Sequence, residues 1–307
     1  MKLKETVTAP FVVLITYGLY YVCFASRLAA QALDQYDEYS LISGIVLIVM
    51  TLLLPAVFYA KAKGVGYSAK MHFLTFRGSR VIFCLCMLVC LITGVILIAM
   101  TSHFLGFADG KYSLVQTYAL RLSERELPVL YRCAAYAVLP AFAEEFLYRG
   151  VVLTEYKQSG FFISVGFSAV LFAFGQFSLV SLPAFLFIGL LMGVIYYVSE
   201  SFLLTVSVRL AFNILLFFFE DGAWSLILKR SNFVFFICLC AVLFLLFLTL
   251  GLSEAQRIYY TKGTDAAQLP RRDKEEKRPW TPAFLSALLS PTFLICTAAF
   301  FAVTLFA

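Results

Sequence analysis

Apolar residues occur along this chain in long blocks, separated by shorter polar segments. A helix that crosses a membrane needs about 20 consecutive, mainly apolar residues, and nine blocks approach or exceed that length. We predict spans over residues 7–26, 41–60, 81–104, 128–156, 161–178, 182–198, 201–219, 232–252 and 283–306. The pattern therefore predicts an all-α fold, a polytopic transmembrane helical bundle of about nine spans.

The composition supports the membrane class. The 307 residues are 62% hydrophobic and 14% charged, whereas a soluble domain is about 45–50% apolar and about 25% charged. Residues 1–32 also have features of a cleaved signal peptide, with Ala30-Gln31-Ala32 as the cleavage site, but Arg27 interrupts that pattern. We therefore interpret residues 7–26 as a first span, and we expect membrane lipid, not nucleic acid, as the surroundings.

The cysteines and histidines predict no metal or cofactor. All eight cysteines lie in apolar runs without a C-x-x-C pair, so they are typical of small buried hydrophobic residues. The chain has only two histidines. We divide it into N-terminal membrane helices with an outer loop (1–127), a motif-bearing core (128–219) and C-terminal membrane helices (220–307) that include a charged linker at 253–282.

The loop charges predict the orientation in the membrane. Loop 61–80 carries five basic residues and no acid, and segment 253–282 carries seven Lys or Arg. Cytoplasmic loops are enriched in Lys and Arg, so both segments are expected in the cytoplasm. This places the N-terminus inside and the C-terminus outside, in what we expect to be a bacterial cytoplasmic membrane.

Four ionisable residues lie at membrane depth, away from the ends of the predicted spans, where charge is expensive and usually functional. Glu145 and Arg149 are four residues apart with the acid first, the favoured order for a helical ion pair. Glu144 lies about 100° around the same helix and points elsewhere. Arg209 is the fourth, and it shares a helix face with Asn213.

The turn at Gly160 relates Glu144 to the next helix. Glu144 lies sixteen residues before this glycine and Gln176 sixteen residues after it, so a helical hairpin places both roughly 24 Å from the turn. The predicted polar cluster therefore contains Glu144, Gln176, Arg209 and Asn213. The alternative is that Gln176 and Asn213 each hold helices together separately.

These residues carry a resemblance to a known family. The sequences EEFLYR (144–149), FAFGQ (172–176) and RLAFN (209–213) resemble the motifs E-E-x-x-x-R, F-x-x-x-H and H-x-x-x-N of the CPBP family. That family comprises CAAX proteases and bacteriocin-processing intramembrane proteases. The resemblance covers about residues 128–219, and it implies a CAAX-protease-like core.

The resemblance also implies roles for the matching residues. Glu144 corresponds to the general base that activates water, Asn213 to an oxyanion donor, and Glu145 with Arg149 to a structural pair. Gln176 and Arg209 replace the two family histidines. A carboxamide cannot take up a proton, so Gln176 can position water but cannot share acid–base work.

The charges inside the membrane favour loss of catalysis. Glu144, Glu145, Arg149 and Arg209 sum to zero, and buried charges tend to pair. We predict that Arg209 pairs with Glu144 and that the protein is a degenerate scaffold that binds a membrane protein or a peptide. One alternative is an active, glutamate-dependent CAAX-type intramembrane endopeptidase. Another is a transporter or channel subunit. Its weakness is that the sequence has no polar stripe repeated across many helices.

Overall fold

The structure is a computed structural model, and it describes residues 3–25, 45–64, 67–73, 78–106, 131, 133–218, 230–267 and 280–306. Within these ranges the chain is helical and contains no strand. The first half contains α1 (Leu3–Ala25), η1 (Val49–Leu53), α4 (Leu54–Ala62), α5 (Tyr67–Lys70), η2 (Gly78–Arg80) and α6 (Val81–Phe104). The middle contains η3 (Ala134–Val138), α9 (Leu139–Glu145), η4 (Phe146–Leu153), α10 (Thr154–Tyr156), η5 (Lys157–Ser159), α11 (Phe161–Phe174), α12 (Leu182–Ser199) and α13 (Phe202–Phe218). The last part contains α15 (Arg230–Ala267), α16 (Trp280–Leu288) and α17 (Pro291–Phe306).

The predicted fold class is confirmed. Each of the nine predicted stretches contains helix in its described part. In the part of the chain that the structure describes, four helices are long and apolar enough to cross a membrane: Ile45–Ala62, Gly78–Phe104, Leu182–Ser199 and Asn232–Tyr260. Shorter apolar helices cover Thr8–Tyr20, Phe161–Phe174, Phe202–Leu216 and Pro291–Leu305. The protein is therefore an all-α, integral membrane protein.

Two C-terminal elements differ from the expected boundaries. The stretch 283–306 is not one helix, because Ser290 and Pro291 restart it: the Ser290 Oγ accepts a hydrogen bond from the Phe293 amide at 3.3 Å, and proline is favoured at the first helical position. Helix α15 continues to Ala267, well past residue 252. Its 38 residues give a length of about 57 Å, nearly twice the roughly 30 Å of a bilayer core.

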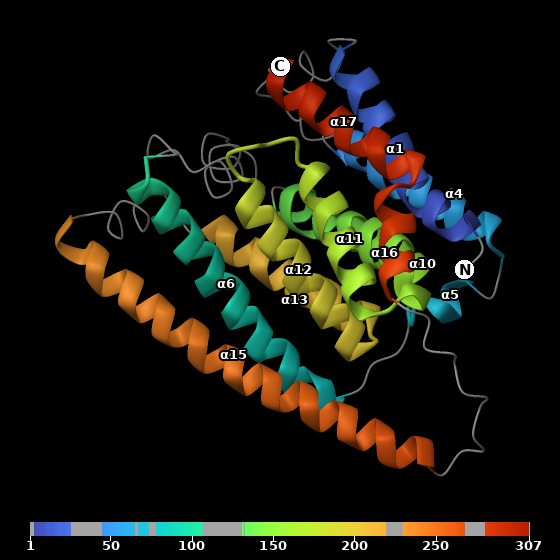
Figure 1. The fold of residues 1–307 in the computed structure, drawn as a ribbon. Coiled ribbons are helices and arrows are strands. Elements are labelled where there is room, and N and C mark those ends of the chain that lie inside the picture. The colour runs from blue at the N-terminus through green and yellow to red at the C-terminus, as the bar shows by residue number, and fades with distance from the viewer. Residues whose placement is uncertain are drawn as a thin grey trace.

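The helices form a bundle with a peripheral pair. Helix α15 packs along α6 at one edge, next to α12 and α13, while α1 and α17 lie together on the far side (Figure 1). Helices α11 and α12 approach closely because Gly189 faces Ala169, where an added Cβ would meet the Ala169 Cα at 2.9 Å. The run η3–α9–η4–α10 lies between these layers and contacts α1, α4, α11, α12 and α13. This central run carries Glu144 and Glu145.

One end of the bundle gathers the ends of several predicted spans. Lys63 after α4 pairs with Glu155 at 3.1 Å, and Lys157 pairs with Glu200 at 3.7 Å. Arg80, just before α6, also pairs with Glu200 at 3.7 Å. Loop 61–80 and the turns near residues 157 and 200 therefore meet at the same end, as a succession of alternating spans requires. That this end is cytoplasmic stays a prediction.

Candidate functional site

The Glu144 carboxylate and the Arg209 guanidinium form a buried ion pair between α9 and α13. Arg209 Nη2 lies 2.5 Å from Glu144 Oε2, and the two side chains are only 3% and 6% exposed. This is a hydrogen bond between charged groups, the strongest ordinary kind. The predicted pairing of Arg209 with Glu144 is confirmed, and it follows the charge balance read from the sequence.

The other Glu144 oxygen is also engaged. Gln176 Nε2 donates to Glu144 Oε1 at 3.3 Å, which confirms the depth match predicted across the turn at Gly160. Gln176 does not lie in the predicted helix 161–178, however. Helix α11 ends at Phe174, and Gln176 follows in a turn in which its amide donates to the Ala173 carbonyl.

Gly175 follows the last residue of α11 at a point where a side chain would not fit. An added Cβ would overlap the Tyr148 hydroxyl, which approaches the backbone at this point. Tyr148 is buried and lies one turn after Glu144 on the central run. The phenol therefore packs against the backbone directly before Gln176, a close approach that the sequence signalled only through the glycine.

Glu145 and Arg149 form the second pair, as predicted. Arg149 Nη1 lies 3.1 Å from Glu145 Oε1, and both side chains are fully buried. Neither of these two atoms has an aligned hydrogen bond within the described residues, so the pair is held by charge. Arg149 Nη2 in addition donates to the Gly189 carbonyl at 3.1 Å, which ties this pair to α12.

The Phe172 ring contacts both guanidiniums. Its centroid lies 4.8 Å from the Arg149 Cζ and 5.2 Å from the Arg209 Cζ, and the ring is fully buried. Cation–π contacts of this kind contribute about 0.5–2 kcal/mol, with larger values for desolvated groups. Phe172 thus links the two ion pairs into one cluster. Sequence analysis identified this residue only as part of a motif.

Asn213 is arranged differently from the other motif residues. Its Nδ2 donates to the Ala137 carbonyl in η3 at 3.2 Å. This contact holds α13 against the start of the central run, which is the structural alternative considered for this residue. The cluster around Glu144 is therefore built from Gln176, Arg209 and Phe172, with Asn213 bound nearby to the backbone.

The central run is also not the uniform α-helix that was predicted. Residues Phe146–Leu153 form a π-helix, as do Ala134–Val138. The Thr154 hydroxyl donates to the Arg149 carbonyl five residues earlier, at 3.1 Å. Short π-helical segments occur often at functional sites. The segment that carries Arg149 is such a π-helical segment.

The chemistry open to this cluster follows from its donors and acceptors. Glu144 receives hydrogen bonds from a guanidinium and a carboxamide, and neither donor can accept a proton in return. The four charges balance in two pairs. The arrangement can bind polar groups and stabilise helix packing, but neither side chain that hydrogen-bonds Glu144 can share proton transfer with it, and the neighbouring Glu145 carboxylate is paired with Arg149.

Comparison with known proteins agrees with the motifs. Residues 126–215 match the family model described as "Rce1-like: Type II CAAX prenyl endopeptidase Rce1-like". No curated protein and no solved structure matches the chain. The match covers all three motifs from Glu144 to Asn213 and nearly all of the segment on which the resemblance rests. Over residues 126–215 the chain is thus similar to the CAAX-protease-like family whose motifs it carries.

Proposed function

We propose that this protein is a CAAX-protease-like membrane protein whose site no longer hydrolyses peptide bonds. In this proposal it acts as a membrane scaffold that binds a membrane protein or a peptide without cutting it. The observation that supports this most directly is the 2.5 Å contact between Arg209 Nη2 and Glu144 Oε2.

The ion pair opposes general-base catalysis for a simple reason. A base must accept a proton from water in the transition state, and a carboxylate held by a permanent cation is a weaker acceptor. Arginine stays charged at any relevant pH, so it cannot release Glu144 by deprotonation. A histidine in the same place would be able to do so, because it changes charge near neutral pH.

The active endopeptidase remains the alternative, and the intact Glu144–Glu145–Arg149 motif favours it. In that case Arg209 would stabilise an oxyanion, as a strong donor can. The two proposals differ in what the Glu144 carboxylate contacts. In the endopeptidase it contacts a water molecule during hydrolysis, whereas in the scaffold it stays bound to Arg209.

Restoring the family histidines tests the proposal. We expect wild-type protein in proteoliposomes to leave a farnesylated CAAX peptide uncut, and Gln176→His with Arg209→His to gain measurable cleavage. The matched control adds Glu144→Gln to the double variant and abolishes that gain. Cleavage by the wild type that the double substitution fails to increase would contradict the proposal.

A further inference from the structure

A short segment at the polar end of the bundle lies across the central run. Residues 67–73, called the strap here, comprise α5 and the turn after it. The Tyr67 hydroxyl donates to the Val151 carbonyl at 3.4 Å. Met71 is 2% exposed, and its methyl group fills the space beside Gly150, where an added Cβ would lie 2.7 Å from it. The strap is therefore packed on η4, next to Arg149.

Hydroxyl contacts connect the strap to the site helix. The Tyr196 hydroxyl donates to the Met71 carbonyl at 2.8 Å and also lies 3.2 Å from the Thr154 hydroxyl. Thr154 in turn donates to the Arg149 carbonyl at 3.1 Å. The three contacts share two hydrogens, one on the Tyr196 hydroxyl and one on the Thr154 hydroxyl. Tyr196 can therefore donate to the Thr154 oxygen once its hydrogen bond to the Met71 carbonyl is broken. Release of the strap would not leave the buried phenol without an acceptor.

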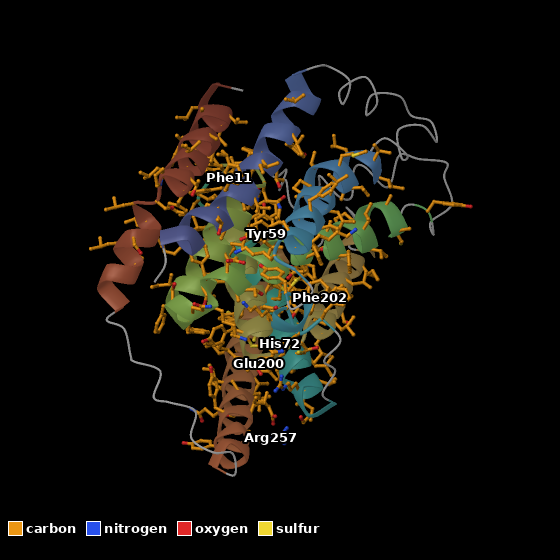
Figure 2. The ribbon with its side chains drawn as sticks, turned by 90° about the vertical axis from the view of Figure 1, so that its right-hand side faces the viewer. Phe11, Tyr59, His72, Glu200, Phe202 and Arg257 are labelled. Atoms are coloured by element: carbon orange, nitrogen blue, oxygen red, sulfur yellow. The ribbon has the colours of Figure 1, made fainter. Side chains whose placement is uncertain are left out.

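The end of the strap is strained. His72 has φ 48° and Glu200 has φ 44°, both in the left-handed region that side chains other than glycine disfavour. The Phe202 amide donates to the His72 carbonyl at 3.3 Å, so the two strained residues lie on either side of one contact. Figure 2 shows His72, Glu200 and Phe202 close together. Strain of this kind persists only where surrounding contacts hold it, and release would relieve it.

Aromatic packing places the strap on the helix that carries the glutamates. Phe73 stacks on Phe202 with centroids 4.9 Å apart and contacts Phe142 and Phe146 edge-on. Phe142 and Phe146 are four residues apart and share one face of the central run. A strap that leaves would therefore uncover that face of the helix that carries Glu144 and Glu145.

The charges around His72 make the contact sensitive to acid. His72 Nε2 lies 3.5 Å from Lys157 Nζ, and an ammonium group only donates, so the imidazole nitrogen must accept. Lys157 is also paired with Glu200, which Arg80 contacts from the other side. Arg80 is held in turn by the Ser199 carbonyl. A protonated imidazole would lose the hydrogen bond and face the Lys157 ammonium at short range.

Two other titratable groups at the strap, Tyr67 and Lys63, do not change charge in the same range. Burial raises the pKa of Tyr67 well above its usual value, so this phenol stays protonated. Lys63 lies beside the strap: burial lowers its pKa, but hydrogen bonds with Tyr59 and Glu155 outweigh this and leave the pKa raised, so Lys63 stays charged. His72 is thus the group of the strap suited to respond between about pH 5 and 8.

We propose that residues 67–73 form an acid-released latch. At neutral pH the His72–Lys157 hydrogen bond adds to the other contacts that hold the strap across the central run. Protonation of His72 replaces that hydrogen bond with repulsion, the strained backbone relaxes, and Tyr196 turns its hydroxyl to Thr154. The proposal stands whether or not Glu144 acts as a base.

Hydrogen exchange followed by mass spectrometry tests the latch on the intact protein in detergent. The strap amides and the Phe202 amide are followed at about pH 7.5 and about pH 5.5, which spans the range where histidine changes charge, with labelling times scaled for the intrinsic pH dependence of exchange. We expect protection of both segments to fall about tenfold at the lower pH, the effect of losing one hydrogen bond to a charged group. Peptides from α11 should keep their protection.

Three variants separate the latch from general acid effects. His72→Gln keeps an acceptor that does not titrate, and Lys157→Met removes the opposing charge; both should abolish the acid response of the strap. His103→Gln changes the only other histidine, which lies in the last turn of α6, and should respond as the wild type does. A wild-type strap whose protection does not change with pH, or an acid response that survives both His72→Gln and Lys157→Met, would overturn the proposal.

Discussion

Removing either partner of the Glu144–Arg209 pair should strongly destabilise the fold. The two charges are 2.5 Å apart, with side chains 6% and 3% exposed, so the survivor of a single substitution is left buried without its partner. Breaking a buried pair in this way costs about 3–5 kcal/mol. Glu144→Ala and Arg209→Ala are each expected to fall in that range. The double variant has no stranded charge and should lose much less than the sum of the two.

A double-mutant cycle measures this coupling. Unfolding in detergent is followed for the wild type, both single variants and the double variant, and we expect an interaction free energy of at least about 2 kcal/mol. The matched control is the Glu254–Arg257 pair, which is nearly as close at 2.7 Å but has side chains 22% and 54% exposed. An exposed pair should couple by about 1 kcal/mol or less. Additive losses at Glu144 and Arg209, or equal coupling in the two cycles, would refute the reasoning.

Three further predictions concern the packing and the orientation. Gly175→Ala should lower stability by about 1–3 kcal/mol in detergent unfolding, because the new Cβ overlaps the Tyr148 hydroxyl, whereas Gly166→Ala, where the space is open, should not. Phe172→Leu should destabilise the wild type by more than it destabilises a variant without the two arginines, because only the wild type loses the cation–π contacts of about 0.5–2 kcal/mol each. The exposed strap residue Lys70, changed to cysteine in a cysteine-free background, should react with an impermeant thiol reagent only after the cells are opened; rapid labelling of intact cells would reverse the proposed orientation.

The features that the sequence predicted correctly were those set by charge and by chain length. The long apolar runs were enough to place the helices, because a membrane leaves a chain few other ways to satisfy its backbone. The equal spacing of Glu144 and Gln176 about Gly160 predicted their contact. Of the four buried charges, Glu145 and Arg149 can pair on their own helix, which leaves Glu144 and Arg209. The sequence therefore predicted the Glu144–Arg209 pair, because an unpaired charge is costly inside a membrane.

Features that depend on packing between distant segments were not predictable. The π-helix at Phe146–Leu153 differs from an α-helix by one residue in its hydrogen-bond register, which leaves little trace in an apolar sequence. The close approach of the Tyr148 phenol to Gly175, just before Gln176, joins two helices and cannot be read from either one alone. The strap contains only a few apolar residues, and its contact with Phe202 joins segments about 130 positions apart in the chain.

The central claim is that Arg209 holds Glu144 out of catalysis, and peptide cleavage tests it most directly. Wild-type protein and the Glu144→Gln variant are placed in proteoliposomes in excess over a farnesylated CAAX peptide, so that even one turnover per molecule is visible by mass spectrometry. We expect an uncut peptide in both samples over hours, since positioned acid–base catalysis contributes about 10²–10⁴-fold and the proposal leaves Glu144 without that role. Cleavage by the wild type that disappears in Glu144→Gln would contradict it and identify Glu144 as a working general base.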